Sequence, residues 1–211
     1  VIDDGTKTTS YNFGFFDLSE PGFIKNFLRG RMYYILAALP IEQDLEYYQQ
    51  AGRGVSIQWL NLTPEQSKRL QERLNYIAKP ENARYRYEYF TNNCASKVRD
   101  MLDETLNGQL QKQMTSSSLG NTYRSESVRL AWPATWMFLG FDLAMSSHGD
   151  KPLNRWQDAF IPMRLAQSLS ETKLPNGKAL VSDVQNVLPH KLPTPPDEMP
   201  DWSLQATFIG I

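Results

Sequence analysis

Residues 84–108 place a strand pattern and a helix pattern on either side of one short turn, and this junction constrains the fold more than any other segment. Before the turn, tyrosines alternate with charged residues, which is the period of a half-buried strand. These tyrosines are Tyr85, Tyr87 and Tyr89. After the turn, apolar residues recur at helical spacing until Asn107-Gly108 stops the helix. They are Ala95, Val98, Met101, Leu102 and Leu106. We expect a strand followed at once by a helix, with Asn92 or Asn93 as the N-cap.

Cys94, the single cysteine of the chain, falls in the first turn of this helix. Backbone N–H groups without helical partners and the helix macrodipole favour an anion there. That environment lowers the pKa of a thiol and produces a thiolate nucleophile. The alternative is a small buried residue chosen for packing, which is the more common role of an isolated cysteine.

Composition excludes several classes of function. The chain has 211 residues, enough for one well-cored domain or a domain with a sizeable subdomain. Its 22 Lys+Arg against 23 Asp+Glu create no global field for nucleic acid. One cysteine cannot form an intrachain disulfide or a cysteine-rich zinc site, and His148 and His190 are too few for most histidine metal sites. We expect neither a metal nor a cofactor.

The most aromatic stretch, residues 131–145, is too short and too interrupted to span a bilayer, which takes roughly 18 to 20 apolar residues. Pro133 and Asp142 are among the interruptions. We expect its aromatic side chains to be buried in the core. Contact of Trp132, Trp136 and Phe138 with a lipid or an acyl chain is the alternative.

The remaining periodicities predict an α+β fold, with a small, antiparallel sheet packed on helices and a helical C-terminal extension. Thr63-Pro64 followed by Gln66 is typical of a capping box at a helix start. The expected strands cover residues 10–16, 32–39, 55–59 and the tyrosine segment; the expected helices cover 22–29, 41–50, 63–79, the cysteine segment and a pair divided by Pro162. The predicted organisation is a core over 1–108, a polar linker or loop over 109–127, a helical extension over 128–188 and a proline-rich tail over 189–211.

Five segments, in a fixed order, carry a resemblance to a known family. Tyr11 to Asp17, Asn26 to Arg31, Leu60 to Thr63 and Tyr87 to Asp100 resemble the Lnb N-terminal periplasmic domain, and the stretch from Pro152 to Met163 resembles its C-terminal part. The Asn-Cys-Ala-Ser-x-x-Arg-Asp piece at Cys94 is the most specific of these motifs. The resemblance covers most of the chain.

This resemblance implies a papain-like thiol fold, similar to the circularly permuted relatives of NlpC-type peptidases. It implies a bacterial, periplasmic or otherwise extracytoplasmic protein, associated with the membrane through sequence outside this chain. Family members named for lipoprotein transacylation move an acyl chain within lipoproteins. By analogy Cys94 takes the acyl group as a thioester, while Asn12, Asp17, Arg31, Tyr89 and Asn93 line or support the site.

The family histidine marks a departure from the pattern. A thiol nucleophile needs a base, and in the family a histidine lies in a Gly-His-x-x-Leu-Arg segment upstream of the Tyr-Asn-x-Gly strand. The chain begins ten residues before Tyr11 and lacks this segment, while His148 and His190 lie in loop-like stretches. We expect the base on a segment upstream of residue 1 that has been cut away; a complete chain would be an inactive relative.

Three functions remain open from the sequence. The first is an extracytoplasmic cysteine-dependent acyltransferase or hydrolase acting through Cys94 on a lipoprotein, lipid or peptide substrate. The second is a cell-wall peptidase or amidase, which would show a polar groove with charged residues in place of an apolar one. The third is a catalytically inactive lipid- or protein-binding module, in which the thiol has ordinary reactivity. A membrane surface is left open as a further partner, and nucleic acid is not expected.

Overall fold

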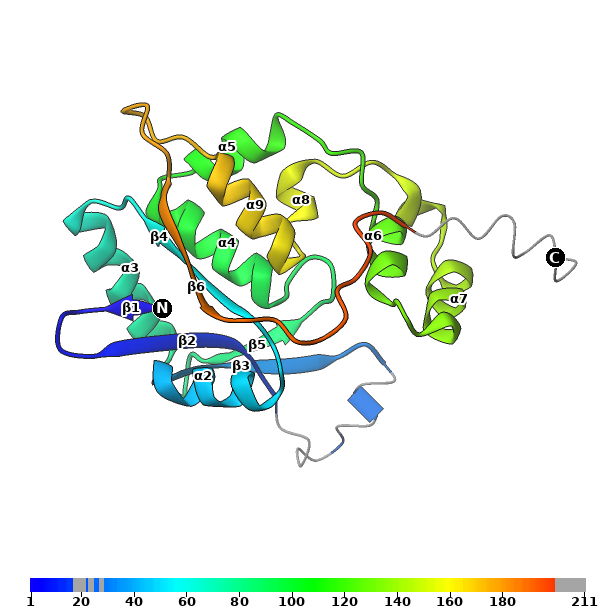
Figure 1. Ribbon diagram of the computed structural model, residues 1–211, viewed down its shortest axis with the longest axis horizontal. Coiled ribbons are helices and arrows are strands. Elements are labelled where there is room, and N and C mark those ends of the chain that lie inside the picture. Colours follow the sequence, from blue (N-terminus) through cyan, green and yellow to red (C-terminus); the bar gives the residue numbers. More distant parts are fainter. Residues whose placement is uncertain (17–21, 23–24, 27–28, 200–211) are drawn as a thin grey trace, which may run out of the picture. The chain divides into compact units, whose positions relative to one another are not determined.

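The computed structural model describes residues 1–16, 22, 25–26 and 29–199, and it combines helices with small antiparallel sheets (Figure 1). The expected α+β class is therefore confirmed. The chain forms two compact units: Val1–Ser117 with Arg155–Leu192, and Ser118–Asn154 with the described part of the tail from Pro193. The chain thus leaves the first unit and returns to it.

The first unit contains a four-stranded antiparallel sheet in the order β1-β2-β3-β5. Its strands are β1 (Ile2–Asp3), β2 (Thr8–Phe15), β3 (Met32–Pro40) and β5 (Arg84–Tyr87). The tyrosine strand ends before Tyr89, which lies in the following turn. The ring of Tyr34, on β3, lies 6.3 Å from that of Tyr85 and 4.2 Å from that of Tyr87, both measured between centroids, so Tyr85 and Tyr87 share one face of β5 as the alternation predicted.

A second sheet pairs β4 (Val55–Leu60) with β6 (Val181–Leu188), which Figure 1 shows side by side. The predicted helical extension over 128–188 is wrong at its end, because β6 is a strand. Its valines recur every third residue, at 181, 184 and 187, and most of its side chains are exposed, so no alternation with period two marked it as a strand. It is a strand because β4 pairs with it across more than a hundred residues of sequence.

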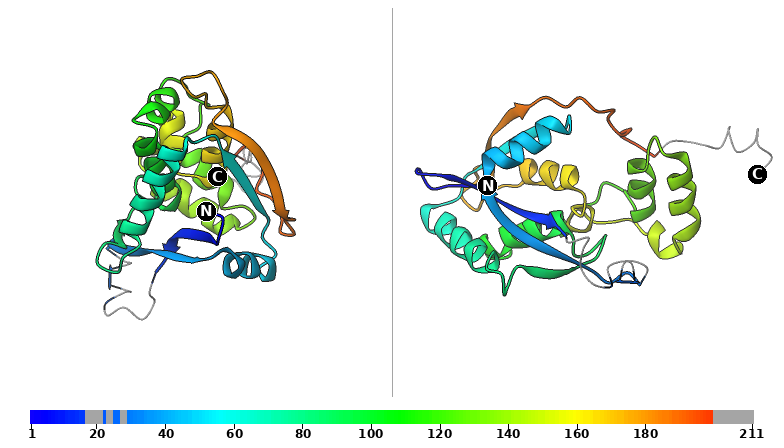
Figure 2. Two further views of the ribbon diagram at one scale, coloured as in Figure 1. Left: turned by 90° about the vertical axis from the view of Figure 1, so that its left-hand side faces the viewer. Right: turned by 90° about the horizontal axis from the view of Figure 1, so that it is seen from below.

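Four helices of the first unit match their sequence signals. They are α2 (Ile41–Gln50), α3 (Pro64–Ile77), α4 (Cys94–Thr105) and α9 (Pro162–Glu171). Thr63 closes the expected capping box with Gln66, and Pro162 starts a new helix after the short α8 (Arg155–Asp158). Leu70 and Leu74 of α3 pack in the main apolar core with Phe13 and Leu36 of the sheet. α4 contributes Met101 and Leu102 to the same core and contacts both β2 of the sheet and α9 (Figure 2).

The prediction of a polar linker or loop over residues 109–127 is also wrong, because helices form there. This segment contains α5 (Gln109–Thr115) and the start of α6 (Tyr123–Leu130). Thr122 caps α6 with a second capping box. Leu110 and Met114 of α5 are buried in the core of the first unit, and these two contacts stabilise an otherwise polar helix. Half of the residues of the expected helix over 22–29 lie outside the described ones.

The second unit holds α6, α7 (Thr135–Ala144) and a 3-10 turn at Ser147–Asp150. The expectation that its aromatic residues are buried is wrong for Trp132 and Trp136, which are 41% and 75% exposed. The side chain of Phe138 is not among those that the structure describes. The proline-rich stretch after Pro189 forms no helix or strand up to Met199. None of the helices formed by the described residues has the length and apolar character needed to cross a membrane.

Candidate active site

Cys94 is the first residue of α4, and Asn93 caps that helix. The Asn93 Oδ1 accepts the backbone N–H of Ser96 at 2.9 Å, and the Ser96 hydroxyl accepts the backbone N–H of Asn93 at 2.8 Å. The Asn93 Nδ2 donates to the carbonyl oxygens of Tyr89 and Phe160, both at 2.8 Å. The buried amide of Asn93 therefore joins the start of α4 to two loops and sets the position of the thiol.

The Cys94 thiol is half-buried, and this changes the expected electrostatics. Burial raises the pKa of the Cys94 thiol, whereas the backbone N–H groups of Ala95 and of Cys94 itself lower it by less. The prediction of a lowered pKa is thus wrong for this structure. The N–H groups do point at the sulfur, as the helix start predicted, but loss of water around a thiolate outweighs them. The thiol needs a base to become a nucleophile at neutral pH.

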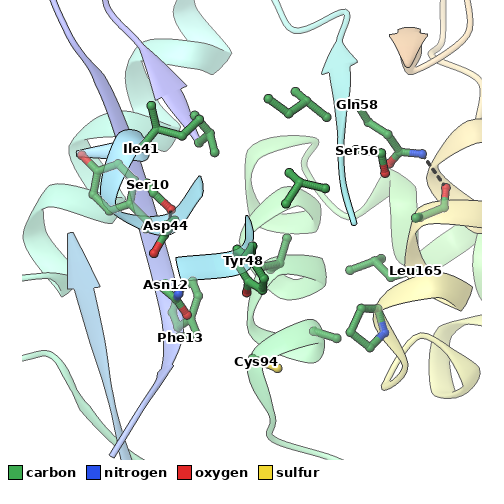
Figure 3. A pocket seen from close by; sticks show the side chains of 18 of the residues that line it. Ser10, Asn12, Phe13, Ile41, Asp44, Tyr48, Ser56, Gln58, Cys94 and Leu165 are labelled. Atoms are coloured by element: carbon green, nitrogen blue, oxygen red, sulfur yellow. Dashed lines mark hydrogen bonds between the residues drawn. The ribbon is translucent and has the colours of Figure 1, made fainter. Parts of the chain in front are cut away.

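A cavity of about 430 Å³ opens beside Cys94, within the size range of ligand sites (Figure 3). Its walls come from β2, α2, β4, α4 and α9, all of the first unit. Most of the lining is apolar, with side chains such as Phe13, Ile41, Val98 and Leu165. Trp132 and Trp136 are not among the residues that border this cavity.

The polar groups of the cavity are few, and most are already hydrogen-bonded. The hydroxyl of Ser10, on β2, donates to the carboxylate of Asp44, on α2. The Gln58 Nε2 donates to the Ala166 carbonyl and to the Ser170 hydroxyl, both at 2.9 Å, which ties β4 to α9. Among the described lining residues, Asp44 is the one acidic side chain, and lysine and arginine do not occur.

Tyr48 of α2 lies between Asp44 and Cys94 in Figure 3 and is a member of the site that sequence patterns did not reveal. Burial raises the pKa of its phenol, and the Asp44 carboxylate raises it further. Burial likewise raises the pKa values of Tyr34, Tyr85 and Tyr87, with the Cys94 charge as a further cause in each. These four tyrosines are therefore within electrostatic range of the thiol. The alternation of Tyr85 and Tyr87 had marked two of them in the sequence.

The other predicted site residues have different positions. Asn12 lines the cavity, and its Oδ1 accepts the backbone N–H of Gly14 at 3.0 Å. Tyr89 is 43% exposed and packs against Phe90, and Arg31 is exposed; neither borders the cavity. Asp17 lies outside the described residues. Of the described members of the supporting set, Asn12 lines the cavity with Cys94, and Asn93 positions the thiol through the helix cap.

Neither histidine borders this cavity. His190 Nδ1 accepts the backbone N–H of Gly54 at 3.1 Å, which occupies one of its ring nitrogens. His148 belongs to the 3-10 turn of the second unit. No group of three or more His, Cys, Asp or Glu side chains with metal-binding geometry occurs among the described residues.

The Arg-Asp pair that completes the cysteine motif has a structural role. Arg99 is buried on α4, with its guanidinium 3.9 Å from the centroid of the Trp156 ring and 2.6 Å from the Trp156 carbonyl oxygen. Its other nitrogens bind the Asp100 carboxylate. Arg99, five residues after Cys94, thus joins α4 to Trp156 of α8.

Residues 7–134 match the family model of the Lnb N-terminal periplasmic domain. The chain belongs to this family. The match covers β2 to α6 and includes Cys94, Asn12 and Tyr48. By its description the family is periplasmic, which confirms the expected extracytoplasmic location. No match was found among curated proteins or among solved structures.

Proposed function

We propose that this Lnb-family domain is a cysteine-dependent acyltransferase or hydrolase in which Cys94 carries the acyl group as a thioester. The observation that carries the proposal is a thiol at the first position of a helix, with two backbone N–H groups directed at it, on the wall of a ligand-sized cavity. The papain-like arrangement implied by the family resemblance belongs to the same proposal.

The chemistry has two steps. The Cys94 sulfur loses its proton to a base and attacks the carbonyl carbon of the substrate, so that a C–S bond forms and the bond to the leaving group breaks, while the proton passes to the leaving atom. Backbone N–H groups at the helix start stabilise the oxyanion. An amine or water then attacks the thioester and regenerates the thiol.

The lining of the cavity favours one substrate class over another. Cell-wall peptides carry several carboxylates, and the described lining residues supply no arginine or lysine to bind them. Apolar side chains dominate instead. The proposal is therefore acyl transfer or hydrolysis on a lipidated substrate such as a lipoprotein, in preference to a cell-wall peptidase or amidase.

A non-catalytic binding module is the second candidate, and the raised pKa of the Cys94 thiol favours it. Such a module would bind its ligand in the cavity without transfer of an acyl group to Cys94. One experiment separates the two candidates.

The chain is incubated with p-nitrophenyl octanoate, with and without added imidazole as an external base, and its intact mass is measured. We expect an octanoyl adduct that depends on imidazole and is released by neutral hydroxylamine, as thioesters are. Cys94→Ala removes the adduct, and Cys94→Ser gives at most a hydroxylamine-resistant ester. Equal labelling of the chain and of Cys94→Ala under both conditions would leave only the binding module.

A further inference from the structure

One side of α7, in the second unit, is apolar and exposed. It carries Trp136, Gly140 and Leu143, which share one side because residues three and four positions apart are neighbours on a helix. Trp136 is 75% exposed and Leu143 is 84% exposed. A Cβ atom at Gly140 would meet no other atom within 4 Å. These three residues, named here the α7 stripe, therefore form an open apolar surface along the helix.

The rest of α7 is held by its own unit. Met137 and Phe141 lie away from the stripe and are half-buried, and α7 contacts α6. Asp142 is the one charged residue of the helix, and its carboxylate lies 3.3 Å from the guanidinium of Arg124. The stripe itself therefore carries no charge, and a partner that covers it has to be apolar.

Backbone carbonyl groups at the C-terminal end of α7 have hydrogen-bond donors within the unit. The Arg124 guanidinium donates to the carbonyl oxygen of Asp142, to that of Met145 at 2.9 Å and to that of Ser146 at 3.3 Å. The backbone N–H of Met145 donates to the Phe141 carbonyl oxygen at 3.1 Å. In hydrocarbon, every backbone polar group needs a partner inside the protein. These bonds let this end of the helix leave water without unpaired acceptors at the four carbonyls.

The size of the α7 stripe favours a lipid bilayer over a protein partner. The helix has 10 residues, so it is about 15 Å long. One side of such a helix offers far less than the ~800 Å² that each partner buries in a stable protein complex. A bilayer needs no matching surface, and a helix with one apolar side lies in its interface. Tryptophan is enriched at that depth because its ring is apolar and its N–H is polar.

We propose that α7 binds the surface of a lipid bilayer, with Trp136 and Leu143 inserted between the lipids and Gly140 lying against them. This inference goes beyond the proposed function, because it requires neither the thiol nor the cavity of the first unit. Since the stripe is uncharged, apolar burial sets the affinity, and anionic headgroups add little to it.

Sedimentation of the full chain with sucrose-loaded vesicles tests the proposal. One kind of vesicle is phosphatidylcholine, and the other is phosphatidylethanolamine with phosphatidylglycerol. Gly140→Asp places a charge in the stripe, and Gly140→Ala is its matched control, because the open space there accommodates either side chain. Trp136→Gln removes an inserted ring, and its control is Trp59→Gln on β4, where the ring is 46% exposed.

We expect the chain to bind both kinds of vesicle at low and at high salt. Gly140→Asp and Trp136→Gln should each weaken binding by about tenfold or more, since each removes apolar burial or adds a charge. Gly140→Ala and Trp59→Gln should bind as the unchanged chain does.

Three results would overturn the proposal: no binding to either vesicle, binding confined to phosphatidylglycerol at low salt, or equal binding by Gly140→Asp and Gly140→Ala. A dimer in solution that Gly140→Asp dissociates would also overturn it, because the stripe would then join two copies of the chain. Cys94→Ala should bind the vesicles normally, so failure of the octanoyl assay leaves this result standing.

Discussion

At the residue scale, Cys94 shows how burial and a helix start act in opposite directions on one thiol. Two backbone N–H groups favour the thiolate, and loss of hydration disfavours it more strongly. The consequence is a thiol that stays protonated at neutral pH. The pH at which the Cys94 thiol becomes reactive should therefore differ between the folded and the unfolded chain.

We predict that the alkylation rate of Cys94 by iodoacetamide rises at higher pH in the folded chain than in urea. The raised pKa of the folded thiol keeps it protonated above the ordinary value of ~8.5, which the unfolded chain shows. The linked stability is fully present below that ordinary value and is lost as pH rises through the folded one. Alkylation profiles of folded and unfolded chains measure the shift. A folded midpoint below the unfolded one would contradict it.

Asn93 should be a stability residue as much as a site residue. Replacing it with alanine removes the N-cap and leaves the carbonyls of Tyr89 and Phe160 without their donor. We predict a loss of roughly 2–4 kcal/mol in the free energy of unfolding. The matched control is Thr63→Ala, at an exposed capping box of the same kind, with a loss of about 1 kcal/mol. Equal losses in urea unfolding would reduce Asn93 to an ordinary cap.

At the element scale, the guanidinium of Arg99 joins α4 to α8 through the ring and the carbonyl oxygen of Trp156. We predict that Arg99→Lys lowers the free energy of unfolding by roughly 1–3 kcal/mol, because lysine cannot both lie flat on the Trp156 ring and donate in the same fork. Arg86→Lys is the control, since Arg86 is exposed and pairs with Glu88 at 3.4 Å, so it should change stability by less than about 0.5 kcal/mol. Similar urea midpoints for the two variants would show that Arg99 contributes charge alone.

Elements with local signals could be predicted from the sequence, and elements that depend on distant partners could not. Thr63 and Asn93 mark their helices through side chains three residues from the N–H groups they bind. β6 carries no such signal, since its partner β4 lies more than a hundred residues away. α5 is polar and takes its stability from the burial of Leu110 and Met114.

The same distinction divides the candidate site. The position of Cys94 at a helix start is local, and the sequence predicted it. The direction of its pKa shift is set by burial from several elements, and Tyr48 and Asp44 reach the cavity from α2 through tertiary packing. A resemblance over residues 11–17 brought Asn12 into consideration, although no periodicity singles it out.

At the scale of the whole molecule, each unit has polar interactions of its own. In the second unit Glu126 and Arg129 form a buried ion pair at 2.6 Å, and the Arg129 guanidinium also donates to the Pro196 carbonyl. We predict that Glu126→Ala destabilises this unit by about 3–5 kcal/mol, because it leaves a buried cation without its anion. Hydrogen exchange should quicken in α6 and α7 and stay unchanged in α4 and α9.

The control for this prediction is Glu104→Ala, which removes an exposed partner of Arg73 at 3.4 Å in the first unit. Its effect on the free energy of unfolding should stay below about 1 kcal/mol. Faster exchange throughout α4 and α9 in Glu126→Ala would show that the two units open as one.

The return of the chain to the first unit at Arg155 has a consequence for biosynthesis. A ribosome releases the chain from its N-terminus, and domains generally fold as units once their residues have emerged. Cys94 and the four-stranded sheet are made early, yet α9 and β6, which pack on α4 and pair with β4, come last. The nascent chain therefore carries an incomplete thiol site, with one side of β4 unpaired, until residue 188 has been added.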